Sequence, residues 1–192
     1  MNFPHQPDQL TAAWLTDALC AALRLHAAHV ASFEVKPFAE TAGLLGQNMI
    51  VRLVYDMPED TAPQSIFAKF ALADADKRAG WRTSYVQEVR FYRQFAQQVA
   101  LPTPRAYFSI SRNSHKATKN TKSAIFNFVP LCLCVRQNRE SLYFAEFDEE
   151  TGHFLLLLED CSYGEAGDRL TGCSLDRARQ AVVEIATFHA TW

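Results

Sequence analysis

Ser65-Ile-Phe-Ala-Lys-Phe-Ala71 is the stretch that decides the fold, because a lysine stands in the middle of residues that favour a β-strand. Successive side chains of a strand point to opposite faces of its sheet, so Lys69 shares a face with Phe67 and Ala71. The residues of the other face are apolar as well: Ile66, Ala68 and Phe70. We therefore expect protein on both sides of this strand. A charge in such surroundings needs a partner, because an unpaired buried charge is costly.

The sequence offers that partner in a helix expected over Tyr85–Ala100. Residues at three- and four-residue spacing form one face of the helix, namely Tyr85, Glu88, Tyr92, Phe95 and Val99. Glu88 thus lies within an apolar stripe, where its carboxylate needs an opposite charge. Pairing Glu88 with Lys69 satisfies both residues. The alternative is that Lys69 reaches solvent from a sheet edge and Glu88 lies at the rim of the buried face.

The composition indicates a globular chain that is large enough for one sizeable domain, with 192 residues, 48% hydrophobic and 21% charged. A net charge of −2 gives no general attraction to nucleic acid or to an anionic membrane. The first residues lack a signal-peptide pattern and no run approaches a membrane span, so we expect a cytoplasmic protein without a membrane partner. The five cysteines are irregularly spaced, which favours free thiols over a zinc site.

Hydrophobic periodicity and turn residues predict the order of elements along the rest of the chain. A first helix is expected over residues 8–23, with Thr11 as its N-cap, and a last helix over residues 174–192, with Ser174 as its N-cap. Between them we expect strands and connections in this order: strand 30–37, two-glycine turn 39–48, strand 49–55, polar hairpin connection 56–64, the lysine strand 65–71, helix 85–100, a short strand within 101–109, a strand pair resuming at 141–147, and buried strand 154–159.

One region differs from the rest of the chain in charge. Residues 112–139 hold six lysines or arginines and no acidic residue, with a basic run followed by an apolar one. A surface for nucleic acid or an acidic partner is one interpretation. We favour a surface insertion, because few aromatic residues stand among the lysines to stack on bases.

Several segments, taken in order, resemble a known family. They are LTAAWLTDAL near the start, RLVY at 52–55, IFAKF at 66–70, EVRFY at 88–92, PTPRAY at 102–107, LLLLED at 155–160 and IATFHATW at 185–192. Together they resemble the amino-terminal part of the aminoglycoside-phosphotransferase and choline-kinase-like superfamily, closest to its ecdysteroid-kinase-like branch. The resemblance covers most of the chain except about residues 110–143.

The resemblance implies roles for six residues around ATP. Lys69 resembles the lysine that holds the α- and β-phosphates, and Glu88 its helix partner. Gly43 and Gly46 occupy the turn that covers the phosphates, where main-chain amides must approach closely, and Gln47 and Asn48 could add donors. Glu159 and Cys161 belong to the hinge, residues 158–161, whose main chain would bind adenine.

The implied fold is α+β. It comprises a protein-kinase-like N-lobe over residues 1–158, with an antiparallel sheet of about five strands, a packed helix and the atypical insertion at 110–143. A hinge and the first helix of a helical C-lobe would follow at residues 159–192.

The sequence departs from the family in its catalytic residues. Phosphoryl transfer needs a carboxylate for the acceptor hydroxyl and ligands for Mg²⁺, and the family's His-Gly-Asp loop does not occur in this chain. We therefore expect half of an ATP-dependent kinase of small-molecule hydroxyl groups, truncated or inactive alone. A partner would cover the incomplete lobe, and the phosphate acceptor is not indicated. The alternatives are a non-catalytic nucleotide- or partner-binding module and a nucleic-acid binder acting through residues 112–139.

Overall fold

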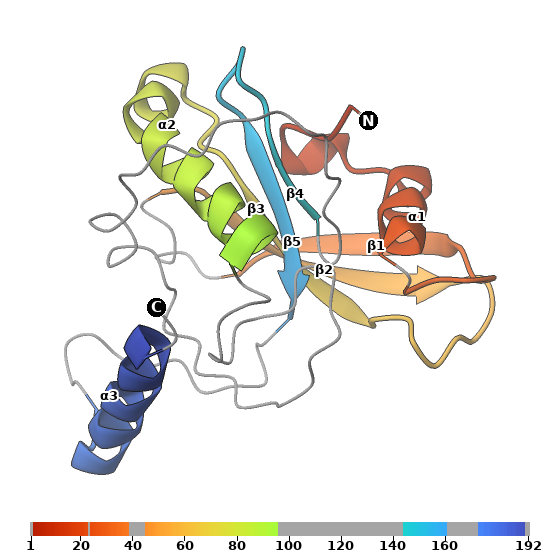
Figure 1. The fold of residues 1–192 in the computed structure, drawn as a ribbon. Helices are drawn as coiled ribbons and strands as arrows, with labels where there is room; N and C mark the ends of the chain where they lie inside the picture. The colour runs from red at the N-terminus through yellow and green to blue at the C-terminus, as the bar shows by residue number, and fades with distance from the viewer. Residues whose placement is uncertain (1, 23, 39–44, 96–143, 161–172, 191–192) are drawn as a thin grey trace.

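A computed structural model describes residues 2–22, 24–38, 45–95, 144–160 and 173–190 (Figure 1). The elements follow in the order η1 (Pro7–Gln9), α1 (Ala12–Ala21), β1 (Val30–Pro37), β2 (Gln47–Tyr55), β3 (Ser65–Phe70), α2 (Ala75–Arg90), η2 (Phe91–Phe95), β4 (Phe144–Phe147), β5 (Phe154–Glu159) and α3 (Leu175–Ala190). The expected α+β class, with an antiparallel sheet of five strands, is confirmed.

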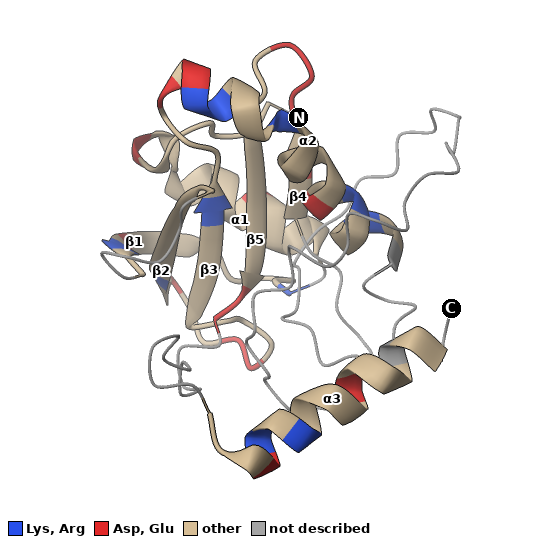
Figure 2. Cartoon of the chain, turned by 90° about the vertical axis from the view of Figure 1, so that its left-hand side faces the viewer, with Lys and Arg blue, Asp and Glu red and all other residues tan. Residues whose placement is uncertain are grey.

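The sheet places the lysine strand at its centre. The strand order is β1-β2-β3-β5-β4, and every neighbouring pair is antiparallel. Lys69 on β3 lies opposite Asn48 of β2 on one side and Leu156 of β5 on the other. The strands carry few charged residues, and most charges gather on the helices and connections (Figure 2). Lys69 is therefore a charge in the middle of a mainly uncharged sheet.

One face of the sheet packs against α1. Thr11 caps this helix, because its side chain accepts a hydrogen bond from the Trp14 amide at 3.1 Å. The Trp14 ring meets Phe144 edge to face, with ring centroids 5.0 Å apart. The predicted cap is thus confirmed, whereas the predicted start at Asp8 is wrong. Residues 7–9 form the separate 3₁₀ turn η1, and extended backbone at residues 10 and 11 interrupts the helix.

The opposite face of the sheet packs against α2. This helix begins at Ala75 rather than at Tyr85, with Asp74 accepting a hydrogen bond from the Lys77 amide at 2.9 Å. Most side chains of its first turns are exposed, so no apolar stripe marks them in the sequence. Further along, the Tyr85 ring stacks on Phe154 with centroids 4.4 Å apart. The expected face is confirmed as far as Tyr92, which is buried.

The last helix, α3, is capped as predicted, because the Ser174 hydroxyl accepts a hydrogen bond from the Arg177 amide at 3.3 Å. Four large apolar side chains of this helix are exposed: Leu175, Val182, Val183 and Ile185. In the described part of the chain, none of the helices combines the length and apolar character needed to span a bilayer. The predictions for residues 101–109, for the basic region 112–139 and for the insertion 110–143 lie outside the described residues.

Candidate functional site

Lys69 and Glu88 form the ion pair expected from the sequence. The Lys69 Nζ atom lies 2.7 Å from Oε1 and 2.8 Å from Oε2 of Glu88, so one ammonium binds both carboxylate oxygens. The Glu88 side chain is 3% exposed and that of Lys69 14%. The ammonium has three hydrogens, and the carboxylate takes two of them. One hydrogen of the ammonium is therefore not used by Glu88.

The surroundings of the pair oppose the charge on Glu88. Burial raises the pKa of the Glu88 carboxyl, and the Lys69 ammonium offsets part of that rise. Aromatic rings line the pair, since Lys69 Nζ lies 5.9 Å from the centroid of Phe154, on which Tyr85 stacks. Because the ammonium also faces this ring, a cation–π attraction adds to its stabilisation. Burial and the Lys69 ammonium therefore act on the pKa of Glu88 in opposite directions, and burial has the larger effect.

The face of the sheet that carries Lys69 presents three successive rows of side chains. Strand alternation and register put Asn48, Lys69 and Leu156 in the first row, and Ile50, Phe67 and Leu158 in the second. The third row holds Arg52 and Ser65, whose hydroxyl donates to the Asp160 carboxylate beyond the end of β5. A charged row and a polar row thus flank an apolar one.

The apolar row is extended by a second aromatic ring. Phe38, just after β1, meets Phe67 edge to face with centroids 5.4 Å apart. Both side chains are only partly buried, so they keep some surface for a ligand. Strand alternation predicts the face of Phe67 correctly but assigns this residue no functional role. Phe38 was missed because its contact with Phe67 depends on the pairing of β1, β2 and β3.

Gly46 lies against Lys69 at the start of β2. A Cβ atom there would stand 2.6 Å from the Phe70 carbonyl oxygen and 3.5 Å from Cε of Lys69. Glycine is required by this close approach of main chain to main chain. Gly46 therefore lies beside Lys69, and its role in covering phosphates stays a prediction. Gly43 lies outside the described residues.

The other expected site residues divide into two groups. Asn48 stands beside Lys69 in the register. Gln47 does not serve the site, because it points to the other face of β2, where its amide donates to the Ala71 carbonyl at 2.9 Å and to Gln6 at 2.8 Å. Its predicted role as an added donor is wrong. Glu159 ends β5, and its role in a hinge stays a prediction, while Cys161 lies beyond the described residues.

Mg²⁺ favours carboxylate oxygens and water. Within the described ranges, no group of three or more His, Cys, Asp or Glu side chains is arranged to hold a metal ion. The described residues therefore form no metal centre built from three or more protein side chains.

Comparison with known proteins found no match to the chain among family models, curated proteins or solved structures. The protein is therefore characterised by its structure alone. The described residues form an α+β fold with a five-stranded antiparallel sheet and a lysine–glutamate pair between the central strand and α2.

Proposed function

We propose that the chain binds ATP on the sheet face that carries Lys69, as the nucleotide-binding lobe of a kinase-like phosphotransferase for a small-molecule hydroxyl group. The observation that carries the proposal is the Lys69–Glu88 pair, with Nζ held by both carboxylate oxygens. The Lys69 side chain also keeps 14% of its surface exposed, which leaves part of it open to a ligand.

The proposed position of the nucleotide follows from the three rows. Phosphate oxygens would accept a hydrogen bond from Lys69, beside the main chain of Gly46. The base would lie on the partly exposed members of the apolar row, Ile50 and Phe67, whose Cα atoms are about 7 Å along their strands from the lysine row. Aromatic and aliphatic side chains suit a flat heteroaromatic ring. The base edge would then face the end of β5 at Glu159, where the resemblance places the hinge.

For the described residues we propose ATP binding only, without phosphoryl transfer. Phosphoryl transfer needs an acceptor-positioning carboxylate and metal ligands, and the described residues hold no group of three or more His, Cys, Asp or Glu side chains arranged for a metal ion. Transfer to a hydroxyl group would depend on groups beyond those described here.

Calorimetric titration with ATP and Mg²⁺ tests the proposal. We expect saturable binding by the wild-type chain and its loss in Lys69→Ala, because a hydrogen bond to a charged group is worth about 1.5–3 kcal/mol. Lys77→Ala is the matched control, since Lys77 is exposed on the first turn of α2. A folded, monodisperse chain that does not bind ATP would refute the proposal. Equal binding by Lys69→Ala and wild type would place the nucleotide elsewhere.

A further inference from the structure

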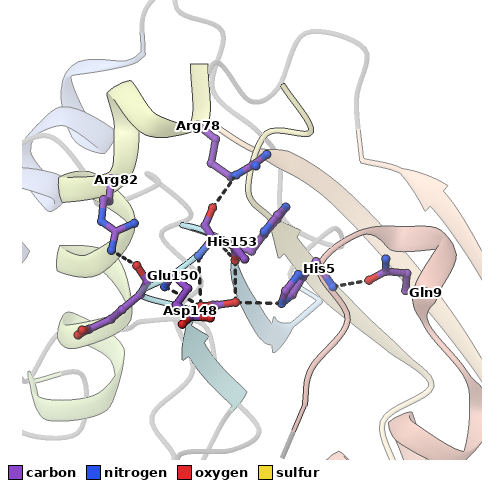
Figure 3. A network of polar contacts seen from close by, with 9 residues as sticks. His5, Gln9, Arg78, Arg82, Asp148, Glu150 and His153 are labelled. Atoms are coloured by element: carbon purple, nitrogen blue, oxygen red, sulfur yellow. Dashed lines mark hydrogen bonds and ion pairs between the residues drawn. The ribbon is translucent and has the colours of Figure 1, made fainter. Parts of the chain in front are cut away.

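The turn between β4 and β5 is held rigidly by its own polar groups (Figure 3). The Asp148 carboxylate accepts hydrogen bonds from the Glu150 amide at 2.8 Å and from the Thr151 hydroxyl at 2.7 Å. Gly152 completes the turn with φ +72°, a conformation that favours glycine. The main chain of this turn, residues 148–153, is therefore a fixed set of carbonyl acceptors attached to the sheet.

Arginines of α2 and η2 bind the main chain of the β4–β5 hairpin at three positions along its length. Arg78 Nε donates to the Thr151 carbonyl at 3.1 Å, and Arg82 donates to the Glu149 carbonyl. Arg93 Nε donates to the Ala145 carbonyl at 2.7 Å. We call these three residues the arginine clamp. Two of its members precede Glu88 in the helix and one follows it, so the clamp spans the residue that meets Lys69.

The arginine clamp contributes much of the attachment of α2 to the sheet, because few apolar side chains of α2 are buried against it. Of the sixteen residues of α2, only Tyr85, Glu88 and Val89 are buried. A helix with so few apolar contacts has weak resistance to sliding along the sheet. A shift by one helical turn would move Glu88 about 5.4 Å, which is twice the length of its hydrogen bonds to Lys69.

The arginine clamp binds a hairpin that belongs to the same sheet as Lys69. The β4–β5 hairpin joins the sheet through β5, and Leu156 of β5 lies opposite Lys69. An arginine that binds the hairpin therefore fixes α2 relative to the strand that carries the lysine. Arg78 also donates to the carbonyls of Leu72 and Ala73 at 2.9 and 2.8 Å, which ties in the chain that leaves β3.

We propose that Arg78, Arg82 and Arg93 are positioning residues: they hold α2 at the position along the sheet at which the Glu88 carboxylate meets Lys69, and so fix the direction of the lysine ammonium. The consequence for nucleotide affinity rests on the proposed function. The consequence for the ion pair itself does not.

Titration of Glu88 by NMR tests the clamp without any nucleotide. The Lys69 ammonium holds down the pKa of Glu88 against burial, so a displaced α2 should raise that pKa in the Arg78→Ala/Arg82→Ala variant. The carboxyl carbon shift of Glu88 reports the change, and a purely structural loss of stability would leave it unmoved in the folded state. Arg90→Ala is the matched control, because Arg90 is exposed on the same helix. Each single variant carries the test if the double variant does not fold.

Calorimetry with ATP and Mg²⁺ separates this proposal from the proposed function. If the wild type binds ATP, we expect the double variant to bind about tenfold more weakly, the loss of roughly one charged hydrogen bond. If the wild type does not bind ATP, the proposed function fails and the Glu88 titration still decides the clamp. An unchanged Glu88 titration in folded Arg78→Ala/Arg82→Ala overturns the clamp, whatever the ATP result.

Discussion

At the scale of single residues, the two members of the ion pair differ in their access to water. Glu88 is 3% exposed and Lys69 is 14% exposed. Breaking a buried pair from one side leaves the other charge without compensation, at a cost of about 3–5 kcal/mol. We expect Lys69→Met to destabilise the fold by about 3 kcal/mol, and Glu88→Gln by less, because Lys69 can turn towards solvent.

The double variant Lys69→Met/Glu88→Gln gives the sharper test of the pair. Replacing both charges removes the uncompensated one, so we expect its free energy of unfolding to lie closer to wild type than that of Lys69→Met. Urea unfolding of the four chains measures the coupling between the two residues. Simple addition of the two single effects would contradict a direct interaction.

At the scale of elements, two glycines should respond to the same substitution with opposite signs. Gly46→Ala would bring a Cβ atom within 2.6 Å of the Phe70 carbonyl oxygen, so β2 and β3 must separate at their ends. Overpacking of this kind costs about 1–3 kcal/mol. Gly80→Ala in α2 meets no atom within 4 Å and should stabilise the helix by about 0.5–1 kcal/mol.

Thermal unfolding of the two alanine variants checks this contrast. Gly46→Ala should also weaken any ligand held by Lys69, because the added carbon would stand 3.5 Å from the lysine Cε. Gly80→Ala serves as its control. A Gly46→Ala chain that is as stable as wild type would show that β2 does not approach β3 as closely as described.

The elements could be predicted from the sequence wherever burial leaves a periodic pattern. β1, β2, β3 and β5 alternate or run as apolar stretches, and Thr11 and Ser174 are ordinary N-caps. The start of α2 could not be predicted in this way, because its first turns face solvent and are fixed by arginines that bind main-chain carbonyls. Such bonds depend on a hairpin some seventy residues away, as in the contact of Arg78 with Thr151.

The site could be predicted only in part for a related reason. The Lys69–Glu88 pair follows from two unusual charges in apolar patterns, each of which required a partner. The aromatic contact of Phe38 with Phe67 could not be predicted in this way, since an apolar residue in a sequence does not indicate which other residue it will contact. The position of Gln47 next to the glycine turn suggests a hydrogen-bond donor for phosphate. The face to which its side chain points depends on where β2 begins, and this side chain donates to the Ala71 carbonyl instead.

At the scale of the whole molecule, His153 joins three parts of the chain and should make stability depend on pH. Its ring stacks on His5 of the N-terminal segment, with centroids 4.3 Å apart. Burial lowers the pKa of His153 from 6.5 to about 4, and the charges of Arg78 and His5 act in the same direction, while Asp148 opposes them. The folded chain therefore resists protonation at this ring.

The sign of the effect follows from the two protonation states. Between pH 6.5 and 4 the unfolded chain binds a proton at His153 that the folded chain does not, so stability falls as the pH falls through this range. We expect His153→Gln to flatten the dependence of the unfolding free energy on pH between 7 and 4.5. The control His26→Gln alters an exposed ring and should keep the wild-type dependence. Identical pH profiles for wild type and His153→Gln would contradict the lowered pKa.

The strand order also has a consequence for the kinetics of folding. β1, β2 and β3 form a meander with short connections, and β4 and β5 form a second local hairpin. Among the described strands, the pairing of β3 with β5, in which Phe67 lies opposite Leu158, unites the two units. Such a non-local pairing forms slowly because a long loop must close first. Lys69 belongs to one unit, and the arginine clamp binds the other. We therefore expect the ion pair to form late, and pulse-labelled amide exchange would contradict this if β5 were protected as early as β2.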